Sequence, residues 1–273
     1  MRAGTSLDQR QLMTDGLSEL YRYRATILAF TERNVRVRYK QAVLGIAWAA
    51  LQPLALMVVF TVALGRLAGL DGGGTSYAAF SLSALVGWSL VQTAVQTASD
   101  SLVVDGSLLR KVYFPREVPV LAGVLAAGIQ FAVGLLIFVV VGPFIGARVA
   151  ATWLLAPLFG IGLMATSAAV SLLLAGLNVY YRDFRHAMPF LLQMWLFLSP
   201  VTYPITVVPE RWRIWYAVVN PIAGMLDGLR MTLAVGALPD PGLTVAGLVG
   251  TTAMALASYR VFKLLEPHFA DVV

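Results

Sequence analysis

The chain has 273 residues, of which 59% are hydrophobic and 12% are charged, whereas a soluble domain of this length carries about a quarter charged residues. This composition excludes an ordinary soluble domain and predicts one integrated membrane domain. The sequence contains no cysteine, which excludes disulfides. The net charge is +6, and insertion into a membrane accounts for this basic balance better than binding to nucleic acid does.

Six apolar stretches dominate the chain, and each is close to the ~20 residues that a helix needs to span a bilayer. Hydrocarbon offers no partner to backbone polar groups, so we expect an all-α polytopic membrane protein with six transmembrane helices. All 14 carboxylates lie outside the stretches. With no buried acid, a proton-driven carrier is not expected, and the energy for any transport has to come from elsewhere. The stretches cover residues 42–65, 80–98, 118–142, 153–177, 187–204 and 243–262.

The basic residues are distributed unevenly between the connections. With six spans, 15 of the 20 Lys and Arg residues fall on one side of the membrane, which predicts that both termini are cytoplasmic. No short apolar core follows an N-terminal basic cluster, so we expect no cleaved signal peptide. These patterns divide the chain into a cytoplasmic N-terminal segment (1–41), a membrane domain (42–265) and a cytoplasmic C-terminal tail (266–273).

Residues 16–40 have the pattern of an amphipathic helix lying at the cytoplasmic membrane surface. Its basic side chains suit anionic lipid headgroups. The alternative is an ordinary charged flank of the first span, which explains the charge but not the spacing. The apolar stripe consists of Leu17, Leu20, Tyr21, Ile27, Leu28, Thr31 and Val35.

The connection 99–117 is expected to be cytoplasmic and to contain a short helix. Leu102, Val103, Leu108 and Leu109 give it an apolar face, whereas glycine weakens a helix and proline ends one, here at 106 and 115. Such a helix could rest on the membrane or dock into a groove of a partner. A plain connecting loop is the alternative.

The connection 205–242 is expected to be external, yet it is largely apolar. Trp212 and Trp215 suit the headgroup level, and Asn220-Pro221 interrupts the run. A broken helix pair that enters the membrane and returns fits this pattern, provided that protein or a water-filled cavity covers its backbone. We interpret it as a gate on the outer face, with a flat surface helix as the alternative.

The sequence contains no motif that would bind a nucleotide or a metal ion. None of the three lysines (Lys40, Lys111 and Lys263) follows a glycine, so the chain has no P-loop. His186 and His268 are far apart, and no pair has metal-ligand spacing. We therefore expect no catalytic residue, no metal site and no cofactor in this chain.

An intramembrane phosphotransferase is a further hypothesis. Asp227-Gly228-Leu229-Arg230 faintly resembles a fragment of the CDP-alcohol phosphotransferase signature, but that chemistry needs several clustered acids. Asp227 stands alone in the sequence. An ion pair between Asp227 and Arg230, three residues apart on a helix, is the favoured interpretation.

Four stretches, in order along the chain, together resemble the permeases of ABC-2 type exporters, particularly those for lipid-linked O-antigen, capsule or teichoic acid. They are RNVRVRYKQAVLGIAW continuing to Gln52-Pro53, LLRKVYFPRE at 108–117, the segment from Asn178 through YRD to Ser199-Pro200, and Asn220-Pro221 with DGLR at 227–230. The sequence departs from the resemblance at Asn34, where an acid is common, and at Asp227, where Glu is more usual.

The resemblance implies a homodimer of permeases in the bacterial plasma (inner) membrane, bound to two ATPase subunits that hold ATP and Mg. The cargo would be a lipid-linked polysaccharide, with a drug or small lipid as the alternative. ATPase-coupling residues would be Leu108, Leu109, Tyr113, Phe114, Pro115, Arg116, Tyr181, Arg182 and Asp183. External gate residues within 206–235 would be Trp212, Trp215, Asn220, Pro221, Asp227 and Arg230.

Aromatic rings provide flat platforms for the apolar faces of sugars. Candidates for lining the glycan path are Trp88, Trp195, Phe197 and Tyr203. The alternative for each ring is contact with lipid or anchoring at the membrane interface.

Overall fold

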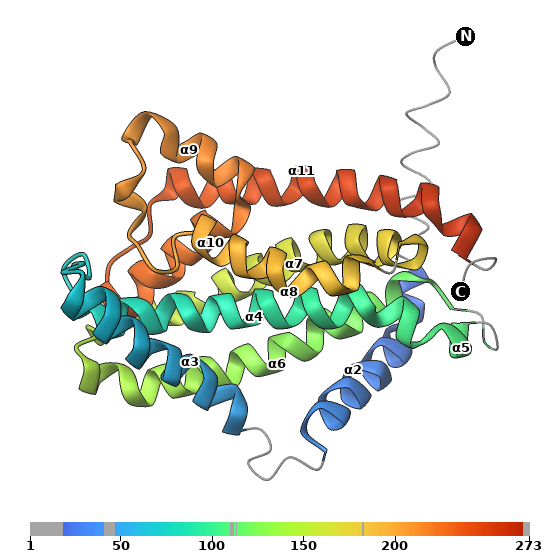
Figure 1. Cartoon of the computed structure of the whole chain (residues 1–273), viewed down its shortest axis with the longest axis horizontal. Helices are drawn as coiled ribbons and strands as arrows, with labels where there is room; N and C mark the ends of the chain where they lie inside the picture. The colour runs from blue at the N-terminus through green and yellow to red at the C-terminus, as the bar shows by residue number, and fades with distance from the viewer. Residues whose placement is uncertain (1–18, 41–46, 110–111, 113, 182, 270–273) are drawn as a thin grey trace.

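The computed structural model describes residues 19–40, 47–109, 112, 114–181 and 183–269. Within these ranges all regular structure is helical, as the composition predicted (Figure 1). Most of the long helices run along the longest axis of the molecule. The chain is therefore a helical bundle with the proportions of a membrane domain.

Among the residues that the structure describes, five helical segments are long and apolar enough to cross a membrane. They correspond to five of the six predicted spans. Trp48–Phe60 (α3) continues into the π-helical turn Thr61–Leu67 (η2). The others are Tyr77–Val104 (α4), Glu117–Val141 (α6) with Gly142–Ile145 (η3), Ala151–Leu155 (η4) with Ala156–Tyr180 (α7), and Pro241–Leu265 (α11).

The predicted span 187–204 differs from the structure. The helix there is Asp183–Leu198 (α8), which has 16 residues and contains Pro189. At 1.5 Å per residue it is about 24 Å long, shorter than the ~30 Å hydrocarbon core. The chain leaves helical geometry after Leu198 and turns. The six-span count is therefore not confirmed, and α8 reaches across a bilayer only with the turn that follows it.

The core of the bundle is built around α4. In its most apolar 18-residue window 78% of the residues are buried, against 17% in the α3 window. Helices α6 and α7 pack along α4, and Trp88, Phe80 and Leu85 of α4 are buried. α3 lies at the edge of the bundle (Figure 1).

The connection 99–117 contains a short helix, Gly106–Leu109 (α5), as predicted. Two details differ from the prediction. α4 continues to Val104 and takes up much of the connection, and Gly106 begins α5 instead of weakening a longer helix. α5 and the C-terminal end of α11, followed by Glu266–His268 (η7), lie at the same end of the molecule (Figure 1).

The N-terminal helix is Arg24–Tyr39 (α2), and residues 19–22 before it are also helical. α2 packs on α6 and is inclined to the long axis of the bundle (Figure 1). Its packed face differs from the predicted stripe, because Phe30 is buried beside Thr31 whereas Leu28 is 63% exposed. Leu17, also in that stripe, lies outside the described residues. A role as an interface helix stays a prediction.

The segment 205–242 is broken at Asn220-Pro221, as predicted. A short turn, Ile205–Val207 (η5), leads to Glu210–Val219 (α9), and Pro221–Arg230 (α10) continues into Met231–Val235 (η6). Every residue of α10 is buried, against α11, α7 and α4. The alternative of a flat surface helix therefore does not fit α10.

Candidate functional site

The segment before α6 is held against α2 by aromatic packing. Phe114 is 3% exposed, and its ring lies 5.5 Å from that of Phe30 in an edge-to-face arrangement. The guanidinium of Arg33 lies over the other ring of the pair, 4.5 Å from the Phe30 centroid. Phe114 therefore positions the predicted coupling segment from within the chain and does not offer its ring to a partner.

The other predicted coupling residues are placed unevenly. Pro115 is buried, whereas Leu108 and Arg116 are half-buried. Tyr181 is 64% exposed and Asp183 is exposed at the start of α8. Tyr113, Arg182 and the side chain of Leu109 lie outside what the structure describes. Among the described members, Tyr181 and Asp183 are the most available to a partner.

Two ion pairs connect the C-terminal end of α4 to neighbouring helices. Arg33 on α2 donates to Asp105 at 2.6 Å, and the Asp105 side chain is only 8% exposed. Arg185 on α8 lies 3.3 Å from Asp100, which also accepts from Asn178 Nδ2 at 3.0 Å. The C-terminal end of α4 is thus linked to the N-terminal helix and to the α7–α8 connection.

A third ion pair links the start of α6 to the end of α11. Lys263 Nζ lies 2.6 Å from Glu117 Oε1 and 2.8 Å from Glu266 Oε2. Glu117 and Asp105 are buried, and so is Asp227. The expectation of no buried acid was therefore wrong, although each of these acids has a cationic partner. Pairing of this kind is what buried charges require.

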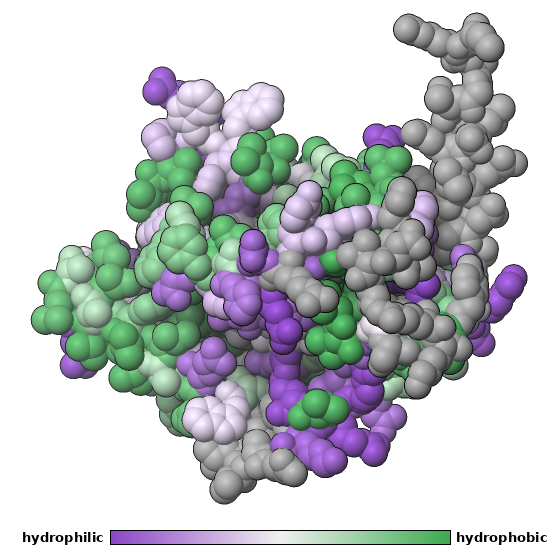
Figure 2. All heavy atoms as spheres, turned by 45° about the vertical axis from the view of Figure 1, so that its right-hand side comes forward, coloured by the Kyte–Doolittle hydropathy of each residue, from purple (hydrophilic) through white to green (hydrophobic). Residues whose placement is uncertain are grey.

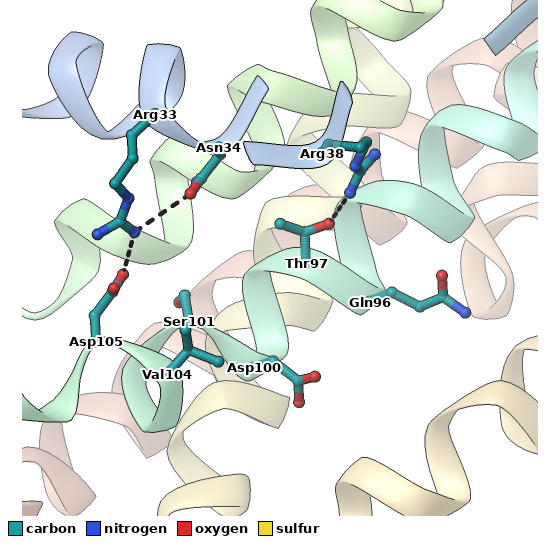
Figure 3. A pocket seen from close by; sticks show the side chains of 9 residues that line it. All are labelled: Arg33, Asn34, Arg38, Gln96, Thr97, Asp100, Ser101, Val104 and Asp105. Carbon is teal, nitrogen blue, oxygen red and sulfur yellow. Dashed lines mark hydrogen bonds and ion pairs between the residues drawn. The ribbon is translucent and has the colours of Figure 1, made fainter. Parts of the chain in front are cut away.

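A cavity of about 340 Å³ opens between α2 and the end of α4. Figure 3 shows Arg33 and Arg38 projecting from α2 toward α4. Arg38 donates to Thr97 on α4 and, at 3.0 Å, to Gln130 on α6. Asn34 lines the same cavity and accepts from Arg33 at 3.3 Å. The neutral residue at 34 therefore lies within a basic and amide-rich site.

The four aromatic path candidates do not form one surface. Trp88 is 2% exposed and packs edge-to-face on Trp195, with 6.1 Å between the ring centroids. Trp195 and Tyr203 are half-buried, and Phe197 is 53% exposed. In this structure Trp88 is part of the core, so of the four rings only Trp195, Phe197 and Tyr203 remain candidates for lining the glycan path.

Asp227 and Arg230 are both buried in α10. The predicted pair is present, with 4.0 Å between Arg230 Nη1 and Asp227 Oδ1. The Arg230 guanidinium stacks 3.8 Å from the Phe80 ring centroid and donates to the carbonyls of Pro200 and Val201. It therefore supplies hydrogen bonds to two carbonyl oxygens in the turn after α8, which have no helical N–H group to accept from.

Burial shifts the pKa values of both members of this pair, and the charge of each partner opposes the shift. Burial lowers the pKa of Arg230 to about 10, and the charge of Asp227 opposes that shift. Burial raises the pKa of Asp227, and Arg230 opposes it. The guanidinium therefore remains a cation at neutral pH.

Side chains at and near the break between α9 and α10 form hydrogen bonds with the end of α8. Asn220 Oδ1 accepts from Trp195 Nε1 at 3.0 Å, and its Nδ2 donates to Ser199 Oγ at 2.9 Å. The Tyr216 hydroxyl donates to the Leu198 carbonyl at 2.6 Å. Burial raises the pKa of Tyr216, which keeps this donor protonated. Of the other predicted gate residues, Pro221 is buried whereas Trp212 and Trp215 are exposed.

No pattern in the sequence predicts a role for Asp100, Asp105, Glu117 or Lys263. Their partners are distant along the chain; Arg33 and Asp105, for example, are 72 positions apart. Helical spacing gives no signal for such pairs. The position of Glu117 beside Pro115-Arg116, inside a segment singled out for other reasons, was the one available indication.

Comparison with known proteins gives a consistent result. The profile of the family described as ABC-2 type transporter matches residues 25–234. A protein of Myxococcus xanthus named O-antigen export system permease protein RfbA is 26% identical over 262 residues, covering 93% of this chain and 98% of the relative. Two proteins of the same name from Klebsiella pneumoniae are 21% and 22% identical over 248 residues, covering 90% of this chain and 94% of each relative.

Proposed function

The chain belongs to the family of ABC-2 type transporters, and from this premise we propose that it is the permease of an exporter for lipid-linked polysaccharide. The observation that carries the proposal is the similarity to permeases named for O-antigen export along nearly the whole chain. No comparable observation favours a drug or small lipid as cargo.

A separate ATPase supplies the energy in this proposal. The chain has no P-loop, and its buried acids are held in ion pairs instead of being arranged as a relay. ATP and Mg would bind to two copies of the ATPase, and two copies of this chain would enclose the path in the bacterial inner membrane. Both termini would be cytoplasmic, since most Lys and Arg residues fall on that side.

The coupling surface would be formed by the α4–α6 connection and the α7–α8 connection. Three ion pairs join these connections to α2, α4 and α11. A force applied by the ATPase at Tyr181 and Asp183 would therefore reach α4 through Asp100 and Arg185. On the outer side, α9 and α10 would act as the gate, because they close over the turn that ends α8.

The phosphotransferase hypothesis receives no support from the site. Asp227 is paired with Arg230, and the described residues contain no group of three His, Cys, Asp or Glu side chains able to hold a metal. A metal-dependent enzyme of that type needs such a cluster.

Deletion of the gene from its host, followed by complementation, tests the proposal. We expect loss of long-chain glycan from the cell surface and its accumulation inside, with both restored by the wild-type gene. Co-purification should recover an ATPase, and reconstituted vesicles should move the glycan lipid only with ATP. Transport by the chain alone without ATP would contradict the proposal.

A further inference from the structure

The open face of α4 is polar, although the helix is apolar where it packs inside the chain. Between Ser81 and Asp100 every residue that keeps part of its surface exposed has a polar side chain, and every apolar residue is buried. The exposed positions are one and three residues apart in alternation, so they share one helix face. We name this face the α4 polar stripe, which consists of Ser89, Gln92, Thr93, Gln96, Thr97 and Asp100.

The other spans expose a different chemistry. α6 exposes Ile129 and Leu136, and α11 exposes Val245 and Leu248, as expected for helices that face lipid. Amide and hydroxyl groups have no partner in hydrocarbon and are costly there. The α4 polar stripe therefore faces water or a polar ligand, not acyl chains.

Three neighbouring cavities converge on the stripe. They have volumes of about 340, 370 and 350 Å³, and Gln96 lines all three. Trp48 and Gln52 of α3 line the second cavity, and Arg185 of α8 lines the third. Figure 2 shows hydrophilic side chains gathered in a band over the middle and lower part of the face that it presents, beside apolar areas.

The groups on these walls match the chemistry of a sugar. The side chains of Thr93 and Gln96 have no hydrogen-bond partner among the described residues, and both types can donate and accept, as sugar hydroxyls do. Trp48 is 52% exposed and offers a flat face to a sugar ring. The acids nearby, Asp100 and Asp105, are already paired with arginines.

We propose that the α4 polar stripe is the wall along which the glycan moves, with Trp48 and Gln96 forming a sugar-binding site at its inner end. This inference rests on the proposed function and adds the residues that contact the cargo. The polar surface of a second copy of the chain is the competing occupant of the stripe, and the first experiment separates the two.

The first experiment uses the absence of cysteine from the chain. Single variants Gln96→Cys and, as the lipid-facing control, Ile129→Cys are placed in the assembled transporter in inside-out vesicles. A membrane-impermeant maleimide should label the first at least tenfold faster than the second, and added glycan lipid should slow that labelling. Equal labelling of the two variants overturns the proposal, as does a disulfide between two copies at Gln96→Cys with no effect of glycan lipid.

The second experiment measures export. The double variant Thr93→Val/Gln96→Leu should lower export roughly tenfold, the factor expected for the loss of one to two hydrogen bonds. The amount of assembled transporter should be unchanged, because the substitutions remove polar groups and introduce neither a charge nor a large change in volume. Thr252→Val on the exposed face of α11 is the matched control and should export normally.

The two proposals fail in different ways. If wild-type protein restores surface glycan but the double variant exports normally, the stripe is not the glycan wall and the permease function stands. If wild-type protein does not restore surface glycan, the proposed function itself is wrong.

Discussion

Arg33 and Asp105 lie 72 residues apart in the sequence, yet their side chains pair at 2.6 Å. This pair joins the N-terminal helix α2 to the end of the central helix α4. Arg33 is 41% exposed whereas Asp105 is 8% exposed, so water screens one side of the pair. Loss of either residue should therefore affect the position of α2 more than the stability of the bundle.

Arg33→Ala is expected to lower the free energy of unfolding by about 1 kcal/mol, since a partly exposed ion pair contributes about that much. A double-mutant cycle with Asp105→Ala, followed by unfolding in mixed micelles, measures the pair directly. The double variant should lose less stability than the sum of the two single variants. Strictly additive losses would show that the contact has no energetic value.

Tyr181→Asp is expected to abolish binding of the ATPase while leaving the chain folded, because Tyr181 is 64% exposed at the predicted coupling surface. Phe114→Asp should instead reduce folded protein, because it buries a charge beside Phe30. Leu238→Asp, an apolar-to-acid change in the exposed connection before α11, is the control and should change neither property. Co-purification and thermal unfolding distinguish these outcomes, and an ATPase still bound to Tyr181→Asp removes the assignment.

Most of the fold was predictable because apolar stretch length and composition determine bilayer-spanning helices. The span at 187–204 was not, because the hydropathy pattern runs on through Pro200 while the backbone turns after Leu198. Hydrogen bonds from Arg230 and Asn220 stabilise that turn, and both residues belong to a segment that follows it in the chain. A local pattern contains no information about such donors.

The candidate site was less predictable than the fold. The Asp227–Arg230 pair could be predicted because three-residue spacing places both on one helix face. The position of Phe114 in the core could not, since an apolar residue in a cytoplasmic connection is compatible with docking and with burial. Gln92 and Gln96 could have been recognised as a polar face within an apolar span, but which face of α4 is open depends on the packing of its neighbours.

Gly224→Ala is expected to destabilise the packing of α10 on α11. A Cβ atom at this position would lie 2.4 Å from the Leu243 carbonyl oxygen, which is backbone and cannot rotate away. Gly128→Ala is the matched control, because its Cβ would meet only the flexible end of Met164 and alanine favours a helix by up to ~1 kcal/mol over glycine. Thermal unfolding should show a loss of at least ~1 kcal/mol for the first variant relative to the second. Equal stability of the two would contradict the close packing of α10 on α11.

Arg230→Met is expected to be the most damaging of these substitutions, with a loss of about 3–5 kcal/mol, because it leaves Asp227 as a buried charge without a partner. The same substitution also removes the donor to the carbonyls of Pro200 and Val201. Adding Asp227→Asn removes the unpaired charge but does not restore the hydrogen-bond donor that Arg230 supplied. The double variant Arg230→Met/Asp227→Asn should therefore recover part of the stability, and the part not recovered measures how strongly Arg230 holds the turn after α8. Full recovery would show that Arg230 serves only to neutralise Asp227, and no recovery would show that the ion pair contributes nothing.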